Sequence, residues 1–523
     1  MKANLLHPDR DFDWKAPSLW NEDTLMADLG LDALFDAMAD GDACILNSAR
    51  KVILSGTGGD PETIRYRQEI VRDCLDHPLV LRQIYAIAVE AKEKEKGHYL
   101  GGLNRYPHWL LRDAIEQMKM FVGMFRKLRR IVDSHAGKFV SRGCTTLCAT
   151  VQHELDDEYL ARADAHLEQL NLDGQTALSA ALDSVSRGTN YVLHRSRRVS
   201  ETWWESKWRQ LRDILFPPNA PPLSFTLHPR DEGGARALDA LRDRGICDTA
   251  IALAQSRDRV RNYFAALRQE LAFYIGCINL HERLTRKKAP ICLPTPSSPQ
   301  ERQFSFCALT DLCLLLERDG QVTANDMQAD ERTLVVVTGA NQGGKSTFLR
   351  SVGIAQVMMQ CGMFVTAESF RSGVCSGIFT HYRREEDIEM KSGKFDEELE
   401  RMSDIVDHVT RDSMVLLNES FATTNEREGS EIGRQVITAL SDNSVRVVCV
   451  THLYEMAREL YERNGKNLLF LRAERKADGT RTFRMIEGEP LPTSHGPDLY
   501  NTIFGADARE KEAGDGRSAA RTA

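Results

Sequence analysis

The stretch TLVVVTGANQGGKSTFLRSVG (residues 333–353) decides the fold of the second half of this chain. It begins with an apolar run rich in β-branched residues, passes through a glycine-rich loop and ends in a helical pattern. Its centre, GANQGGKS (339–346), fits the pattern G-x-x-x-x-G-K-[ST]. A strand, a loop and a helix in this order point backbone N–H groups and a helix N-terminus at one place, where phosphate groups can bind. The stretch therefore predicts a nucleotide-binding loop in an α/β domain.

The residues of this loop have separate predicted roles. The glycines permit the tight turn, Lys345 would reach the β- and γ-phosphates of ATP, and the Ser346 hydroxyl would ligate Mg²⁺. A glycine-rich turn with an accidental lysine is the alternative, and the strand and helix on either side disfavour it. The loop residues predicted to bind nucleotide are Gly339, Ala340, Asn341, Gln342, Gly343, Gly344, Lys345, Ser346 and Thr347.

A second apolar strand, MVLLNE (414–419), ends in an amide and a carboxylate. Enzymes of this class usually have two carboxylates here, one that supports Mg²⁺ and one that positions the attacking water. Glu419 can take the second role, while Asn418 offers an oxygen without the charge. We therefore predict Ser346, Asn418 and Glu419 at the metal, with slow hydrolysis. A site that binds ATP and scarcely hydrolyses it is the alternative.

A third apolar strand, VRVVCVTH (445–452), ends in His452, which could reach a γ-phosphate from the far side. A core histidine is the alternative reading. The residues predicted to be catalytic are Lys345, Glu419 and His452.

Composition limits the classes of protein to consider. The 523 residues suggest two to four domains, and a formal net charge of −8 excludes a general polyanion binder, so any nucleic-acid surface must be a local basic patch. No apolar run approaches the roughly 18 residues that span a bilayer, and MKANLLHPDRDFDWK (1–15) lacks the apolar core of a secretory signal. The twelve cysteines form no CxxC pair. These features favour reduced thiols, a cytoplasmic location and no membrane partner.

The helical and strand patterns divide the chain. Apolar residues at helical spacing predict long helices, and alternation predicts a short strand at 223–231. The Pro- and Ser-rich stretch 287–303 reads as a linker, after which short apolar strands alternate with helices. The predicted long helices cover 67–94 (interrupted by Pro78), 145–172 and 251–284. The predicted organisation is a mostly α-helical domain (1–290), a linker (291–303), an α/β domain (304–504) and a disordered tail (505–523).

Several motifs together resemble the ATPase domain of the MutS family of DNA mismatch-repair proteins. QVTANDM (321–327) resembles the segment that flanks the adenine in that family, which implies Val322 and Asn325 as nucleotide contacts. The motifs are TGANQGGKSTFLRSVG (338–353), FT with the charged loop after it (379–387), SGKFDEELERM (392–402), LLNESFATTNEREG (416–429) and VTHLYE (450–455). More weakly, ETIRYRQEIVRDCL (62–75) and RNYFAALRQELAFYIGCINLHERL (261–284) resemble parts of the helical core, or lever, domain.

The resemblance implies a multidomain protein, with a helical core, lever and clamp domain followed by a P-loop ATPase domain of the ABC type, in which two copies complete each other's sites. SGKF (392–395) would contact the partner's nucleotide through Ser392 or Gly393. In the family a serine stands at the position that Gly393 occupies here. The loop TTNEREG (423–429) would contact the opposite subunit. No stretch resembles the family's mismatch-reading or connector domains, so direct mismatch recognition is not expected.

Two basic stretches could meet DNA phosphates, at 124–142 and 194–212. The second also holds Trp203, Trp204 and Trp208, which could stack on unpaired bases but are more often buried. A solvated helix face is the alternative for both stretches. The predicted DNA contacts are Arg126, Lys127, Arg129, Arg130, Arg195, Arg197 and Arg198.

The sequence therefore predicts a homodimeric, DNA-dependent ATPase that uses ATP and Mg²⁺ to clamp DNA in mismatch repair, or in a related repair or recombination process. An ATP-gated structural protein that clamps a protein partner is the alternative. A transporter ATPase subunit is disfavoured, because the long helical arm precedes the ATPase.

Overall fold

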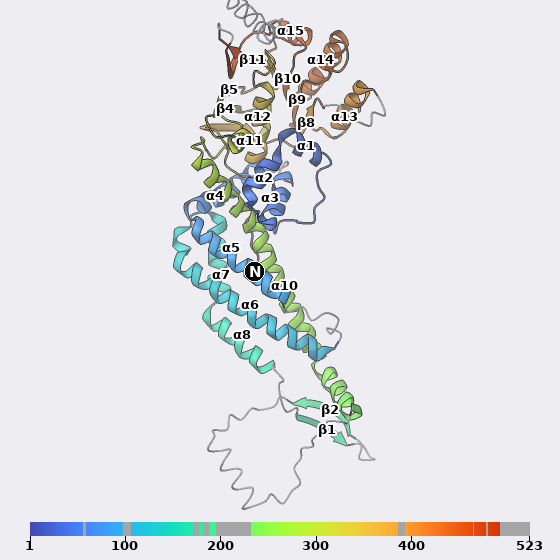
Figure 1. Cartoon of the computed structure of the whole chain (residues 1–523). Coiled ribbons are helices and arrows are strands. Elements are labelled where there is room, and N and C mark those ends of the chain that lie inside the picture. The colour runs from blue at the N-terminus through green and yellow to red at the C-terminus, as the bar shows by residue number, and fades with distance from the viewer. Residues whose placement is uncertain are drawn as a thin grey trace, which may run out of the picture. The chain divides into compact units, whose positions relative to one another are not determined.

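A computed structural model describes residues 1–55, 59–97, 106–170, 177–182, 188–194, 232–384, 393–463, 465–476 and 480–491 (Figure 1). The strand predicted at 223–231 and the tail predicted at 505–523 lie outside these residues.

The described part is helical first and then mixed α/β. The helices are α1 (Glu22–Leu29), α2 (Leu31–Ala39), α3 (Ala43–Ser55), α4 (Pro61–Asp76), α5 (Pro78–Gly97), α6 (Pro107–His135), α7 (Arg142–Glu154), α8 (Asp157–Leu170), α10 (Glu232–Arg286), α11 (Leu312–Glu317), α12 (Lys345–Gln360), α13 (Lys394–His408), α14 (Glu426–Asp442) and α15 (Tyr454–Glu462). The strands are β1 (Ala177–Leu182), β2 (Gly188–His194), β3 (Thr295–Ser297), β4 (Phe304–Leu309), β5 (Asn325–Gln328), β6 (Leu334–Thr338), β7 (Ser369–Gly373), β8 (Ile378–Tyr382), β9 (Met414–Asn418), β10 (Arg446–Val450), β11 (Leu468–Arg475) and β12 (Arg481–Glu487).

The chain divides into two compact units. The first contains Met1 and residues 83–136 and 148–268, and the second contains residues 2–82, 137–147 and 269–523. The first four helices therefore belong with the sheets, because α1 packs on β8 and α12 and the Asn21 amide donates to the Ile378 carbonyl at 3.0 Å. Three of the unit boundaries fall inside helices, α5, α7 and α10, and another falls between residues 136 and 137.

A six-stranded sheet forms the centre of the second unit, in the order β12-β11-β6-β10-β9-β8. The strands from β11 to β8 are parallel, and β12 pairs with β11 in the antiparallel sense. Every residue of β6 and β8 is buried, which is typical of parallel strands covered on both faces. Helices α13, α14 and α15 cover one face with an apolar cluster that includes Met402, Ile437 and Met456. The apolar strands predicted at the start of 333–353, at 414–419 and at 445–452 are confirmed as β6, β9 and β10.

A four-stranded sheet, in the order β3-β7-β4-β5, lies in the same unit. Its strand β3 falls inside the segment that composition predicts to be a linker. There β3 pairs with β7, and the Cys292 N–H donates to the Val365 carbonyl at 3.1 Å. Two prolines of this segment, Pro296 and Pro299, occupy an edge strand and the start of a helical turn, where a missing N–H costs no ladder bond.

The predicted helices are present with two differences. The break at Pro78 is confirmed, since α4 ends at Asp76 and α5 begins with the proline at its first position. The single helix predicted at 145–172 is wrong, because α7 ends at Glu154 and α8 begins at Asp157. The Asp156 carboxylate accepts the N–H of Tyr159 at 2.6 Å and so starts a new helix. The helix predicted at 251–284 lies within α10, which has 55 residues.

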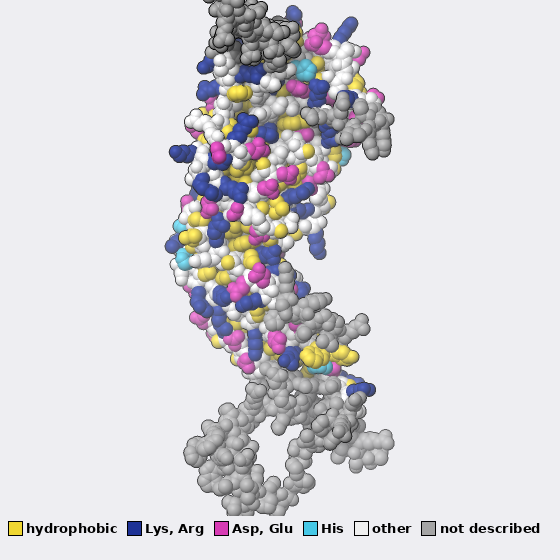
Figure 2. All heavy atoms as spheres, in the orientation of Figure 1, with side chains coloured by type: hydrophobic (Ala, Val, Ile, Leu, Met, Phe, Trp, Pro, Cys, Tyr) yellow, Lys and Arg dark blue, Asp and Glu magenta, His cyan; other side chains and the backbone are white. Residues whose placement is uncertain are grey.

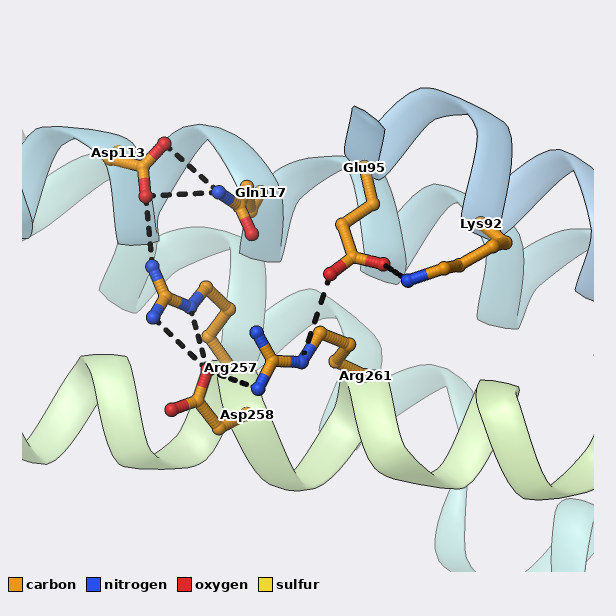
Figure 3. A network of polar contacts seen from close by, with 7 residues as sticks. All are labelled: Lys92, Glu95, Asp113, Gln117, Arg257, Asp258 and Arg261. Carbon is orange, nitrogen blue, oxygen red and sulfur yellow. Dashed lines mark hydrogen bonds and ion pairs between the residues drawn. The ribbon is translucent and has the colours of Figure 1, made fainter. Parts of the chain in front are cut away.

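A polar network joins α5, α6 and α10 in the first unit (Figure 3). Its centre is an ion pair between Arg257 and Asp113 at 2.8 Å, with side chains 11% and 5% exposed. The Gln117 amide donates to both Asp113 oxygens at 2.9 Å. Asp258 then bridges Arg257 and Arg261. Because the buried charges have partners on two helices, loss of one partner would strand the other and loosen the packing of α6 on α10.

The N-terminal segment is fastened by a buried acid in the second unit. The Glu270 carboxylate, on α10, accepts the N–H groups of Leu5 at 2.6 Å and Leu6 at 3.2 Å. Glu270 is 0% exposed, and the second oxygen of its carboxylate has no hydrogen-bond partner. Burial raises the pKa of Glu270 to about 7, against the lowering effect of the two N–H donors.

We predict that the free energy of unfolding of wild type falls as pH rises from 4.5 to 7 because Glu270 ionises, and that Glu270→Gln lacks this decrease. The folded state holds the Glu270 proton to a higher pH than the unfolded state, so ionisation of this group destabilises the fold across that window. Glutamine resembles the protonated acid and stays neutral. Chemical unfolding at pH 5 and pH 8 should show the variant gaining, relative to wild type, up to on the order of 3 kcal/mol. An equal difference at both pH values would contradict this role.

Candidate nucleotide and metal site

The candidate site lies where the parallel strands end. The register pairs Val450 with both Val337 and Asn418, so the carboxyl ends of β6, β10 and β9 meet at one edge. The glycine-rich loop follows β6, Glu419 follows β9 and His452 follows β10. Ligands of open parallel sheets bind beyond the carboxyl ends of the strands, so this edge is the expected place.

The glycine-rich loop passes close to β11. Gly339 has φ +115°, and a Cβ at this position would lie 2.9 Å from the backbone nitrogen of Ala473. Gly344 caps α12 at φ 89°. Both positions therefore require glycine, and together they turn the chain into the helix N-terminus. The loop shape predicted from the motif has this physical basis.

Lys345 is folded into the loop. Its ammonium donates to the carbonyls of Gly339 at 2.9 Å and Ala340 at 3.2 Å, and the residue is 4% exposed. Burial lowers the pKa of Lys345, and the negative charge of Glu419 partly offsets this lowering. A phosphate group would supply the counter-charge that this buried cation lacks, so the lysine favours an anion in the site.

Ser346 and the end of β9 meet directly. The Ser346 hydroxyl donates to the Asn418 amide oxygen at 3.0 Å. The carboxylate of Glu419 lies 3.9 Å from Nδ1 of His452 and 4.0 Å from Nη1 of Arg383. The residues predicted to act on phosphate, metal and water are thus brought together.

These oxygens fit a magnesium ion that is held partly by the nucleotide. Ser346 Oγ, the Asn418 amide oxygen and the Glu419 carboxylate are hard oxygen donors, and Mg²⁺ is usually held by one or two carboxylates together with substrate phosphates. Within the described ranges no group of three or more His, Cys, Asp or Glu side chains could hold a metal by itself. Substrate phosphates would therefore have to complete the coordination.

A cavity of about 840 Å³ joins these groups. It is lined by residues 341–347, Glu419 and His452, and also by Val322 and Asn325. The Asn325 side chain is engaged by β12, because its amide oxygen accepts the Met485 N–H at 2.7 Å.

Arg383 and Phe483 are among the lining residues that the sequence did not single out. Phe483 is 48% exposed and lies beside Gly344. A Cβ added at Gly344 would lie 3.5 Å from the Cβ of Phe483. An exposed aromatic ring in a polar cavity offers a flat surface for a base. Arg383 adds a cation beside Glu419. Arg383 directly follows β8, which could have signalled it, whereas the hairpin that carries Phe483 has no such sequence signal.

The predicted partner-facing residues are elsewhere. Gly393 is exposed and forms the N-cap of α13, and it does not line the cavity. Ser392 lies outside the described residues.

The described basic residues of the first stretch are largely paired with acids. Of the four cations predicted to contact DNA in this stretch, Arg130 is exposed and the other three have carboxylate partners. On the face seen in Figure 2, Lys and Arg side chains are interspersed with Asp and Glu rather than gathered by sign. Arg195, Arg197, Arg198 and the tryptophans at 203, 204 and 208 lie outside the described residues. The three ion pairs are Arg126–Asp164, Lys127–Glu90 and Arg129–Asp133.

Among the described helices, none has the length and apolar character needed to cross a membrane.

Comparisons with known proteins agree with this arrangement. Residues 59–287 match the MutS2 N-terminal domain, and residues 335–502 match MutS domain V. The second match includes the glycine-rich loop, Asn418, Glu419 and His452.

Individual relatives match over part of their length. Endonuclease MutS2 of Geobacillus thermodenitrificans is 30% identical over 152 residues, which are 29% of this chain and 19% of the relative. DNA mismatch repair protein MutS of Porphyromonas gingivalis is 32% identical over 185 residues, 34% of this chain and 20% of the relative. MutS of Desulforamulus reducens is 35% identical over 141 residues, 26% and 16% of the two chains. The chain thus spans about a fifth of the length of the first two relatives.

A helical part followed by a mixed α/β sheet domain with this loop is consistent with the class of proteins that carry MutS domain V. The two matched models together cover most of the chain, and the chain belongs to the MutS family.

We predict that Asn418→Asp strengthens the response to magnesium. An added carboxylate beside Ser346 should attract Mg²⁺ and should repel a nucleotide that carries no metal. The Mg²⁺ concentration that half-saturates ATP binding should fall about tenfold, equivalent to about 1.4 kcal/mol. Fluorescent-ATP binding in a magnesium titration measures this shift.

The matched control is Asn443→Asp, the same change at the exposed end of α14. An equal shift in both variants, or none in Asn418→Asp, would remove Asn418 from the metal site.

Proposed function

We propose that this MutS-family chain is a DNA-binding ATPase whose ATPase unit is of the P-loop, ABC type. The observation that supports it best is the convergence of Lys345, Ser346, Asn418, Glu419 and His452 at one sheet edge. These groups match the parts that ATP hydrolysis needs: a phosphate-binding lysine, oxygens for a metal and a carboxylate for water.

The residues would divide the reaction as follows. Lys345 would leave the Gly339 and Ala340 carbonyls and bind the β- and γ-phosphates. Glu419 would orient the attacking water, and His452 would contact the γ-phosphate from the β10 side. Magnesium, when bound through Ser346 and Asn418, would neutralise charge on the phosphates. Catalysis would be positional and electrostatic, as phosphoryl transfer generally is.

Two copies would complete each other's sites. In the proposed homodimer the start of α13, next to SGKF (392–395), would face the partner's nucleotide, and the loop 423–429 would contact the partner. Gly429 supports the shape of that loop, because a Cβ there would lie 2.2 Å from the Phe421 carbonyl oxygen.

The helical unit would act as the lever. Helices α5, α7 and α10 continue from one compact unit into the other, and a continuous helix transmits displacement better than a loop. ATP binding and release at the sheet edge would thereby open and close the levers around DNA. The relatives named DNA mismatch repair protein MutS support DNA as the partner and mismatch repair as the process.

A protein partner is the second candidate. The ion pairs of Arg126, Lys127 and Arg129 and the net charge of −8 favour it, because these cations already have partners and the chain as a whole repels polyanions.

We predict that DNA stimulates ATP hydrolysis. Turnover should be slow without DNA and rise several-fold with at least one of duplex, mismatched or junction DNA at 50 mM salt. If about six phosphates are contacted, affinity for DNA should fall roughly a thousandfold between 50 and 200 mM salt. Phosphate release with this panel of DNA structures measures both effects.

Glu419→Gln is the control for the site. It should bind ATP, hydrolyse it at least about a hundredfold more slowly, and have the mass of two chains in light scattering with ATP and Mg²⁺. Unstimulated turnover with every DNA would favour the protein-clamp candidate. Unchanged turnover in the variant would remove Glu419 from its role.

A further inference from the structure

The turn that carries Glu419 has an unusual backbone. Glu419 has φ 55° and Phe421 has φ 65°, so two of three consecutive residues adopt a left-handed conformation without being glycine. Such residues are strained and persist only where their surroundings hold them. Because this turn sets the direction of the Glu419 carboxylate, whatever holds the turn also sets the place of the attacking water.

Glu398 of α13 holds this turn through two hydrogen bonds. One of its carboxylate oxygens accepts the Phe421 N–H and the other accepts the Thr423 hydroxyl, both at 2.5 Å. Glu398 is 2% exposed. Hydrogen bonds to a buried carboxylate are stronger than neutral ones, so the turn is fastened to α13 at two points.

His381 of β8 braces the same turn from the sheet. Its Nδ1 lies 2.7 Å from the Ser420 hydroxyl, and its Nε2 lies 3.1 Å from the Glu398 carbonyl oxygen. A carbonyl only accepts, so Nε2 carries the proton and Nδ1 is the acceptor. The single proton of the Ser420 hydroxyl is shared between Nδ1 and the His381 carbonyl oxygen, which lies 2.9 Å away. Burial, helped by the positive charge of Arg401, lowers the pKa of His381 to about 4. The ring therefore stays neutral at physiological pH and keeps both contacts.

Helix α13 connects this anchor to the partner-facing segment. Its N-cap is Gly393, and Glu398 lies little more than one helical turn further on. Helix α13 packs against β8 (Figure 1). The Arg401 guanidinium donates to the Tyr382 carbonyl at 3.1 Å. A short helical segment is stiff, so a displacement at residue 393 reaches Glu398 with little loss.

We propose that Glu398 is a positioning residue that couples the two ATP sites of the dimer, by tying the partner-facing start of α13 to the turn that carries Glu419. The proposal rests on the proposed function, since it needs two sites and a catalytic Glu419. When the partner's nucleotide engages the start of α13, Glu398 draws the turn into the geometry that aligns water. Each site then hydrolyses ATP fastest when the other is filled.

The primary test is Glu398→Gln. Glutamine has nearly the same shape but turns an N–H group toward one of the two donors, so the turn loses one anchor. The turnover number should fall about tenfold to a hundredfold, because a small misplacement of a catalytic group has effects of that size. The dissociation constant for ATP should stay within about twofold, since Glu398 does not line the nucleotide cavity.

Two controls separate positioning from general damage. Glu400→Gln changes an exposed carboxylate on the same helix and should leave turnover unchanged. Thr423→Val removes the hydroxyl that Glu398 accepts and should repeat the defect, while Thr423→Ser keeps the hydroxyl and should restore turnover. The Thr423 pair decides the question even if Glu398→Gln does not fold.

The coupling has its own readout in the rate as a function of ATP concentration. Wild type should show a Hill coefficient above 1, and Glu398→Gln and Thr423→Val should give a value near 1 at unchanged ATP affinity. A purely structural role would lower the melting temperature and ATP affinity together, which would overturn the proposal. Wild-type turnover and cooperativity in both variants would also overturn it. Failure of wild type to bind or hydrolyse ATP would instead overturn the proposed function.

Discussion

The parallel register of β6, β10 and β9 is the constraint on which the rest of this molecule depends. It fixes three strand ends at one edge, so that the glycine-rich loop, the Asn418–Glu419 pair and His452 meet although they are far apart in the chain. Side chains on both faces of these strands pack against the elements that cover the sheet, and a slip by one residue would exchange the two faces and lose that packing. The chemistry of the site is a consequence of the sheet.

The same sheet edge is tied to the elements around it by few, buried polar contacts. Glu398 and His381 hold the turn after β9 through hydrogen bonds. Asn325 holds β12 beside the loop, and the Lys345 ammonium donates to loop carbonyls. Each of these is a buried polar side chain with defined hydrogen-bond partners, and loss of one partner is costly where water cannot replace it. Such contacts make a site responsive, since a small shift of one element is passed to the next.

Much of this arrangement could be predicted from the sequence. The loop motif, the apolar strands and the residues that end them have local signals, and the structure brings them to one edge of the sheet. Arg383, Phe483 and Glu398 were missed because their roles depend on contacts between distant segments. The stop at residues 155–156 was missed because a single capping carboxylate outweighs a continuous apolar pattern. Proline-rich composition predicts a linker at 291–303, because composition does not reveal the pairing of β3 with β7.

The central claim is that the edge of this sheet binds a nucleoside triphosphate through Lys345, and calorimetric titration of ATP tests it most directly. Wild type should bind ATP with Mg²⁺ at micromolar affinity, and Lys345→Ala should bind about ten- to a hundredfold more weakly, the range expected for a lost hydrogen bond to a charged group. Equal affinity in the two proteins, or no heat of binding in wild type, would contradict the account.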